Sequence, residues 1–363
     1  MNFPMKYPRL LLTLGALAVA CLPCAHLSAA DAPKASTADL SKPVQVFILL
    51  GQSNMVGLGK VTGPDGSLDF AVKNKKKYPH LVDAAGNWAE RTDVRNVRVM
   101  VGRSGGMQLF NNEFLKVGGK TMGPEYGIGH PLGDAVEAPV MLLKSCIGNR
   151  SLGWDLLPPG SERYVFEGKV YAGYKDRPDS WAVDPAKGTA TVPAPWVDKA
   201  GKPIDWYAGK QYDDDIANAK KVLADLGKYY PGATKYEVAG FFFWQGEKDG
   251  GNASHASKYE ENLVRFIKHL RKDFDAPNAK FVLATLGEAT KGSTGNGGKI
   301  LEAQLAVDGT SGKYPEFKGN VAAVYANPLS KGGSGNSHYN GNAETYMDVG
   351  EAMGKAMAAL LKK

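Results

Sequence analysis

"VQVFILLGQSNMVG", residues 44–57, is an almost continuous apolar run that stops at Gly51 and then presents a glutamine, a serine and an asparagine. Such a run is typical of a strand that is covered on both faces, as in a parallel sheet. In an open α/β sheet, ligands bind beyond the carboxyl ends of the strands. Ser53 therefore stands where either a helix cap or a nucleophile is expected, and the serine alone favours the cap.

Strand-like and helix-like segments alternate along the rest of the chain. Further apolar runs cover residues 97–101, 138–146, 238–244, 280–286 and 321–326. Apolar residues at helical spacing cover 216–226, 259–270 and 346–360, and Gly227 is expected to end the first of these helices. This alternation predicts an α/β sandwich with a mostly parallel sheet.

Residues 153–211 interrupt the alternation. They hold four of the six tryptophans, Trp154, Trp181, Trp196 and Trp206, and show neither period. A structureless loop of this length is uncommon in a compact domain, so we expect an ordered insertion over the ligand edge of the sheet. Its tryptophans either stack on sugar rings or simply pack the insertion. Trp154 is the candidate for substrate binding because it is nearest in sequence to the end of a strand.

The N-terminal residues 1–30 have the composition of a signal peptide. Lys6 and Arg9 precede an apolar run of 16 residues, which is short for a membrane span, and small residues end at Ala30. A buried N-terminal helix is the alternative. We expect cleavage near Ala30, a linker over 31–43, a catalytic domain over 44–363, and a secreted or periplasmic protein. Cleavage would leave Cys146 as the only cysteine, which excludes an intrachain disulfide.

Three other segments place polar residues at predicted strand ends or helix starts. "FFFWQGE" (241–247) ends in Gln245 and Glu247, "MLLKSCIGNRSLGW" (141–154) contains Gly148, and "GNSHYNGNAETY" (335–346) places His338 ahead of the last helix. A hydroxyl, a base and a carboxylate are thus expected to converge on one rim of the sheet. The presence of these groups on the same rim favours the role of nucleophile for Ser53 over that of a helix cap.

These motifs together resemble the SGNH hydrolases, specifically the sialate O-acetylesterase-like group that includes carbohydrate esterase family 6. The resemblance rests on "GQSNM" (51–55), "MGPEYGIGHPLGDA" (122–135), "WQGE" (244–247) and "HYNGNAETYMDVGEAMG" (338–354), and spans about residues 44–361. It implies a flavodoxin-like three-layer α/β/α fold and hydrolysis of acetyl esters on carbohydrates. The implied partner is an acetylated poly- or oligosaccharide.

The resemblance also implies roles for individual residues. Ser53 takes the nucleophile position and His338 that of the base, because a serine hydroxyl is a weak nucleophile until a neighbouring base removes its proton. The candidates for the oxyanion hole are the backbone N–H groups of Ser53 and Gly148 and the side-chain amide of Gln245.

The sequence departs from the family pattern at two places. Gly335 stands where many relatives have an acid three residues before the histidine, so Glu247 is the candidate that orients His338. A buried structural carboxylate is the alternative for Glu247. Asn149 and Arg150, two further candidates for substrate binding, stand where relatives often show Gly-Thr. Arg150 is expected to narrow the pocket or to favour an acidic sugar.

The remaining features indicate no metal, cofactor, nucleic acid or stable membrane insertion. His80, His130, His255 and His269 lack zinc-site spacing. "KNKKK" (73–77) is too short and isolated for nucleic-acid binding and fits a solvated loop. Two rival functions remain open: an esterase of the same fold acting on lipid or peptidoglycan acetyl esters, and a degenerate sugar-binding domain. The oligomeric state is not predicted.

Overall fold

The computed structural model describes residues 38–102, 105–333 and 338–362, besides Met1. The chain divides into two units, 1–34 and 35–363, and all elements below belong to the second. The predicted signal peptide and most of the predicted linker lie outside the described residues. None of the helices in the described ranges is long and apolar enough to cross a membrane.

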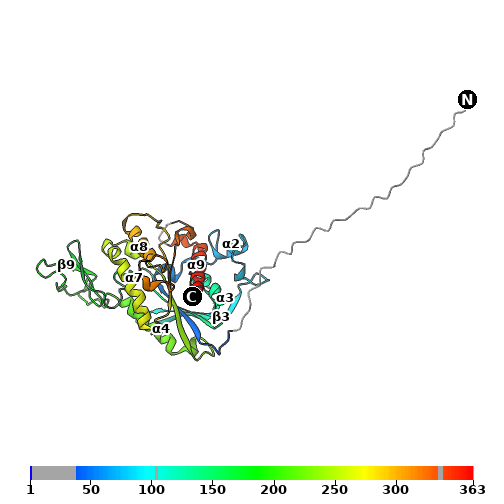
Figure 1. Cartoon of the computed structure of the whole chain (residues 1–363), viewed down its shortest axis with the longest axis horizontal. Coiled ribbons are helices and arrows are strands. Elements are labelled where there is room, and N and C mark those ends of the chain that lie inside the picture. Colours follow the sequence, from blue (N-terminus) through cyan, green and yellow to red (C-terminus); the bar gives the residue numbers. More distant parts are fainter. Residues whose placement is uncertain (2–37, 103–104, 334–337, 363) are drawn as a thin grey trace. The chain divides into compact units, whose positions relative to one another are not determined.

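A seven-stranded sheet forms the centre of the second unit (Figure 1), in the order β12-β11-β10-β1-β6-β3-β4. Its strands are β1 (Val44–Gly51), β3 (Glu90–Val101), β4 (Met107–Lys116), β6 (Val140–Ser145), β10 (Tyr236–Trp244), β11 (Lys280–Ala284) and β12 (Val321–Val324). All neighbours pair in parallel except β3 and β4. The carboxyl ends of β10, β1 and β6 therefore lie side by side.

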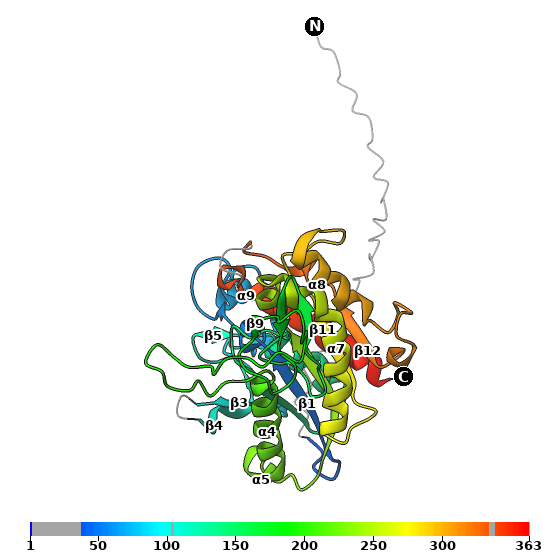
Figure 2. The same cartoon turned by 90° about the vertical axis from the view of Figure 1, so that its left-hand side faces the viewer.

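Helices cover both faces of this sheet, because alternate side chains of the buried strands point to opposite sides. Ile48 and Leu50 pack with one group of helices, whereas Phe47 and Leu49 pack with the other. The first group is α4 (Lys210–Ala224), α7 (Ala253–Asp273) and α8 (Gly295–Ala306), and the second is α2 (Leu68–Lys73), α3 (Glu125–Ala135) and α9 (Ala343–Leu361). The views in Figures 1 and 2 show these layers, which confirm the predicted three-layer sandwich.

Two details of the predicted elements were wrong. The segment expected as a strand over 97–101 begins at Glu90 and pairs antiparallel with β4, which was not predicted. Strand β4, "MQLFNNEFLK", is an edge strand in which only one residue is buried, so it lacks an apolar run. The first predicted helix ends at Ala224, and Gly227 lies inside the next short helix instead of ending the first.

The aromatic insertion, residues 153–211, is ordered. It contains an antiparallel sheet of β7 (Tyr164–Phe166), β8 (Lys169–Tyr171) and β9 (Ser180–Ala182), which stands out beyond α7 and α8 in Figure 1. A small core of Trp154, Leu157, Ala172 and Ala208 packs against Trp181, Trp196 and Trp206. The tryptophans thus supply the insertion with a core of its own.

Short elements connect these layers. They are α1 (Ser53–Val56), α5 (Leu226–Tyr229), α6 (Glu247–Gly250), the paired strands β2 (Gly59–Lys60) and β5 (Thr121–Met122), and the 3-10 turns η1 (Pro79–Leu81), η2 (Pro315–Phe317), η3 (Asn327–Leu329) and η5 (Tyr339–Gly341). Cys146 is buried and free.

Candidate active site

Three neighbouring strand ends bring the candidate residues together. Ser53 follows β1, Glu247 follows β10 and Gly148 follows β6, and β1 lies between the other two strands. The fourth component, His338, comes from the segment before α9 and not from a neighbouring strand. The topology of the sheet therefore places most of the site, and the last helix completes it.

Gly51 makes the sharp corner that exposes Ser53. It has a φ of +141°, and a Cβ at this position would overlap the carbonyl oxygen of Trp244 on β10. The same carbonyl accepts the N–H of Gln52 at 3.2 Å. Only glycine fits such a backbone conformation and such a close approach. The strand consequently ends at Gly51, and the next residues turn into the cavity.

Ser53 and His338 form the central contact of the site. Ser53 Oγ lies 2.8 Å from His338 Nε2, which is hydrogen-bonding distance. His338 is partly buried, and this burial lowers the pKa of its imidazole below the usual value. The ring is therefore neutral near pH 7 and able to accept the hydroxyl proton.

The backbone beside Ser53 offers two N–H groups to a developing negative charge. Gly148 approaches so closely that a Cβ there would lie 3.4 Å from the Cβ of Ser53. Within the described part of the chain, no hydrogen bond uses the N–H of Ser53 or of Gly148. Both groups are thus free to donate, as an oxyanion hole requires.

The expectation that Gln245 donates to an oxyanion does not fit the structure. Its side chain is fully buried, and its amide nitrogen already donates to Arg150 O at 2.9 Å and to Asp249 Oδ2 at 2.6 Å. Tyr259 OH donates to its carbonyl oxygen at 2.9 Å. An amide has only two N–H donors, and both are occupied. Gln245 therefore has a structural role: its hydrogen bonds hold the segments beneath the cavity together.

Glu247 contacts the residues on either side of Ser53 instead of His338. Asn54 Nδ2 donates to Glu247 Oε1 at 2.7 Å, and Gln52 Nε2 donates to Glu247 Oε2. Among the described residues there is no hydrogen bond between Glu247 and His338. Desolvation, reinforced by the carboxylate of Glu288, raises the pKa of Glu247 to about 7. The geometry favours the alternative interpretation, a structural carboxylate, here partly buried, that organises the fold locally.

A cavity of about 830 Å³ opens at this corner. Its lining includes, besides Ser53, Gly148, Glu247 and His338, residues from the insertion and from α6 and α7: Asn149, Ser151, Trp154, Asp155, Asp179, Lys248, Gly251, Asn252 and His255, together with Gln52. Trp154 and Asn149 thus lie where substrate-binding residues were expected. The insertion forms part of the cavity wall.

Arg150 does not line this cavity. Its guanidinium lies over the ring of Trp206 at 4.5 Å and reaches Asp155 Oδ1 at 3.4 Å. Asp155 therefore balances part of its charge within the insertion. These contacts do not support the expectation that Arg150 narrows the pocket or favours an acidic sugar, which stays a prediction.

His255 lines the cavity, although its spacing in the sequence indicated no functional role. It is 5 % exposed, and its Nε2 lies 3.0 Å from Asp179 Oδ1. Although burial opposes the charge, the hydrogen bond to Asp179 and the nearby carboxylates raise the pKa of His255. The partners lie 76 residues apart, so no local spacing reveals the pair.

Asp249 ties the cavity wall to the sheet. Its two carboxylate oxygens accept the N–H groups of Leu152 and Gly153, each at 2.8 Å. Both residues precede Trp154, so these two hydrogen bonds fix the start of the insertion next to the site. Residues 38–102, 105–333 and 338–362 contain no cluster of His, Cys, Asp and Glu that could hold a metal ion.

The C-terminal half of the chain matches a known protein family. Residues 186–359 match the family described as "Carbohydrate esterase, sialic acid-specific acetylesterase". The matched part includes Glu247 and His338 but not Ser53. No curated protein sequence shows a significant match to the chain.

Several solved structures are similar at low identity. One is a protein from Arabidopsis thaliana, with 18% identity, 87% of this chain and 98% of that chain covered, and a TM-score of 0.48. A second is a carbohydrate acetylesterase from Xanthomonas citri, with 15% identity, a TM-score of 0.48, and coverage of 88% of this chain but only 57% of that one. A third is NanS, with 13% identity, 78% of each chain covered and a TM-score of 0.38.

The three-layer sandwich with its serine and histidine at the sheet edge is that of an ester hydrolase. The family matched over residues 186–359, the sialic acid-specific acetylesterases, is a family of carbohydrate esterases, which agrees with this geometry. The resemblance to the sialate O-acetylesterase-like group is thereby confirmed.

Proposed function

We propose that this protein is a secreted serine esterase that removes O-acetyl groups from carbohydrates through an acetyl-enzyme. The observation that carries the proposal is the 2.8 Å contact between Ser53 Oγ and His338 Nε2, beside the free N–H groups of Ser53 and Gly148. A nucleophile, a base and oxyanion donors are the parts that acyl transfer needs.

In the first half of the reaction, Ser53 Oγ attacks the acetyl carbonyl carbon while His338 Nε2 takes the hydroxyl proton. The N–H groups of Ser53 and Gly148 stabilise the resulting oxyanion; one such donor typically contributes about 3 to 4 kcal/mol to lowering the barrier. The intermediate collapses, the bond to the sugar oxygen breaks, and His338 returns the proton to that oxygen. Water then attacks the acetyl-Ser53 ester in the same way and releases acetate.

Glu247 serves this reaction as a positioning residue. It accepts hydrogen bonds from the side chains that flank the nucleophile, Gln52 and Asn54. Asn54 is held in turn by Tyr346 OH, which donates to its Oδ1 at 3.0 Å. This network fixes the corner and hence the direction of the Ser53 hydroxyl.

The cavity supports a carbohydrate substrate. An acetyl group fills only a small part of about 830 Å³, so most of the contact must involve the molecule that carries it. Trp154 offers an aromatic surface, and Asn149, Asp179 and Asn252 offer polar groups of the kind that bind sugar hydroxyls. Export is supported by the composition of residues 1–30, and N-terminal sequencing of the exported protein tests cleavage near Ala30.

The test compares the wild-type protein with Ser53→Ala on a small chromogenic acetate and on a panel of acetylated polysaccharides. We expect acetate release by the wild type, and release at least 10³-fold slower by the variant at an unchanged melting temperature. Residual activity within tenfold of wild type would remove Ser53 from the mechanism. A wild-type protein that binds the polysaccharides without releasing acetate would be a sugar-binding domain, and activity on acetylated lipid or peptidoglycan alone would change the substrate class.

A further inference from the structure

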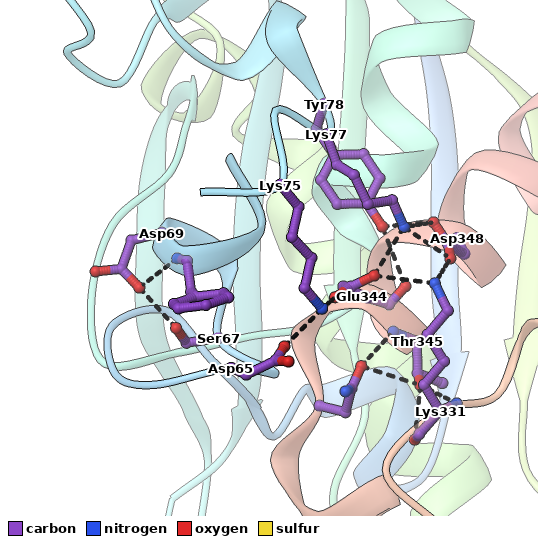
Figure 3. Close-up of polar contacts among 12 residues, drawn as sticks. Asp65, Ser67, Asp69, Lys75, Lys77, Tyr78, Lys331, Glu344, Thr345 and Asp348 are labelled. Carbon is purple, nitrogen blue, oxygen red and sulfur yellow. Dashed lines mark hydrogen bonds and ion pairs between the residues drawn. The ribbon is translucent and has the colours of Figure 1, made fainter. Parts of the chain in front are cut away.

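Six charged residues form an ion-pair cluster at the start of α9 (Figure 3). We call it the α9 cluster; its members are Asp65, Lys75, Lys77, Lys331, Glu344 and Asp348. Lys75 and Lys77 belong to the "KNKKK" stretch, which was expected to be a solvated loop. Residues 73–76 are exposed, and the ammonium groups of Lys75 and Lys77 in addition pair with a carboxylate of α9.

Glu344 is the centre of the α9 cluster. Its side chain is 4% exposed and pairs with Lys75 at 2.5 Å, Lys77 at 2.9 Å and Lys331 at 3.0 Å. Although burial opposes its charge, these three hydrogen-bonded lysines lower the pKa of Glu344 to about 2. A nearly buried carboxylate with three cations is far more constrained than an exposed surface pair.

Lys331 connects the α9 cluster to the segment that carries His338. Besides its ion pairs, its backbone N–H donates to Thr345 Oγ1 at 2.7 Å, and its carbonyl accepts from the same hydroxyl at 3.0 Å. Both the main chain and the side chain of Lys331 are thus held by the first turns of α9.

We call residues 332–340 the His338 segment. Its two described ends, 332–333 and 338–340, contact each other. Gly332 has a φ of +84°, and a Cβ there would overlap the carbonyl oxygen of Tyr339. Asn340 Nδ2 donates to the carbonyl of Gly332. Residues 332 and 339–340 therefore form a tight base, with Lys331 directly on one side and His338 directly on the other.

Lys77 provides a natural comparison within the α9 cluster. It bridges the same two carboxylates as Lys331, at 2.9 Å from Glu344 and 3.4 Å from Asp348, against 3.0 Å and 2.7 Å for Lys331. Lys77 reaches them from the segment before η1, whereas Lys331 reaches them from the base of the His338 segment. Loss of either cation weakens the α9 cluster, but only Lys331 lies next to that base.

We propose that Lys331 is a positioning residue for His338: its ion pairs with Glu344 and Asp348 fix the base from which the imidazole reaches Ser53. The inference rests on the proposed function in that His338 is the base of the reaction. Small displacements matter for this contact, because a shift of about 1 Å in a reacting group can cost about 10²-fold in rate.

The experiment compares Lys331→Met with Lys77→Met in the full chain. Two rates are measured: kcat for acetate release, and the rate at which a fluorophosphonate labels Ser53. We expect Lys331→Met to lower both rates about tenfold with little change in KM. Lys77→Met should keep both rates within about twofold of the wild-type values. The two methionine variants should lower the melting temperature by similar amounts. Lys331→Arg, which keeps the charge, should restore most of the activity.

Three outcomes would overturn the proposal: equal rate losses in the two methionine variants, no rate loss in Lys331→Met, or no rescue by Lys331→Arg. Should Lys331→Met not fold, Lys331→Gln replaces it in the same comparison with Lys77→Gln. Failure of the proposed function can be distinguished from failure of this proposal. If the wild-type protein reacts with the fluorophosphonate but releases no acetate, the labelling rates of the variants still test the role of Lys331. A wild-type Ser53 that is not labelled at all would refute both.

Discussion

Glu247 Oε1 accepts a hydrogen bond from Asn54 Nδ2 at 2.7 Å, while its other oxygen accepts from Gln52. Ser53 lies between these two donors in the sequence, so one carboxylate holds the nucleophile corner from both sides. Glu247 therefore contacts the residues that flank Ser53, whereas the sequence led us to expect that it orients His338.

Glu247→Gln should therefore lower kcat by about 10- to 100-fold in a folded protein. A glutamine has only one acceptor oxygen, so its NH₂ group would face one of the two amide donors. Glu288→Gln is the matched control, because Glu288 is near Glu247 electrostatically but is exposed. It should retain wild-type kcat at pH 8. Normal turnover in Glu247→Gln would show that the corner is held without this carboxylate.

The pH dependence of kcat/KM should show two groups on its acid side. Glu247, with a pKa of about 7, becomes protonated first as the pH falls and loses acceptor capacity. His338, whose pKa is lowered by burial, becomes protonated at a lower pH and can no longer accept the serine proton. Because the Glu288 carboxylate raises the pKa of Glu247, Glu288→Gln should move the upper inflection to lower pH. An identical profile in that variant would argue against Glu247 as the upper group.

The sequence predicted the parts of the site that depend on strand ends. The apolar runs before Gly51, Cys146 and Gln245 predicted buried parallel strands, and parallel strands bring their carboxyl ends to one edge. The position of His338 ahead of the last helix was likewise visible. These features follow from hydrophobic patterning and from chain order.

Side-chain direction beyond a strand end could not be predicted. Gln52 and Gln245 both follow apolar strands, yet Gln52 lines the cavity, whereas Gln245 is buried against Tyr259. The direction depends on the turn that each strand makes and on which helix packs behind it. The pair of Asp179 and His255 was missed for a related reason, since it joins the insertion to α7.

The Asp179–His255 pair should make stability depend on pH. A histidine whose pKa is raised in the folded state contributes stability that is fully present below its unfolded pKa and is lost as the pH rises through the folded value. Asp179→Asn should therefore lower the melting temperature more at pH 5.5 than at pH 8.5. Asp198→Asn, which removes an exposed carboxylate of the same insertion, should show no such difference. Equal losses for Asp179→Asn at both pH values would contradict the raised pKa.

Chelation should leave the enzyme unchanged. The proposed chemistry uses Ser53, His338 and two backbone N–H groups, and none of these steps needs a Lewis acid. Treatment with EDTA followed by dialysis should therefore alter neither kcat nor the melting temperature. Activity that is lost and then restored by zinc or calcium would contradict the mechanism.

We expect Trp154 to contact the polymer. Trp154 is 9% exposed, lines the cavity and packs edge-on against Trp196, with 5.9 Å between ring centroids. It therefore belongs both to the core of the insertion and to the cavity wall. Trp196 packs against that core but does not line the cavity, which makes it the matched control.

Trp154→Ala should lower the stability of the protein by about 3 kcal/mol, as expected for a large aromatic side chain removed from a packed site. Trp196→Ala should also lower it, because the two rings support each other. Only Trp154→Ala should raise KM for an acetylated polysaccharide, since stacking on a ring contributes about 0.5 to 1.5 kcal/mol beyond area burial. Turnover of a small acetate ester should change little in either variant, because that substrate does not reach the ring. Equal KM values in the two variants would show that Trp154 is packing alone, and the polymer would then bind elsewhere along the cavity.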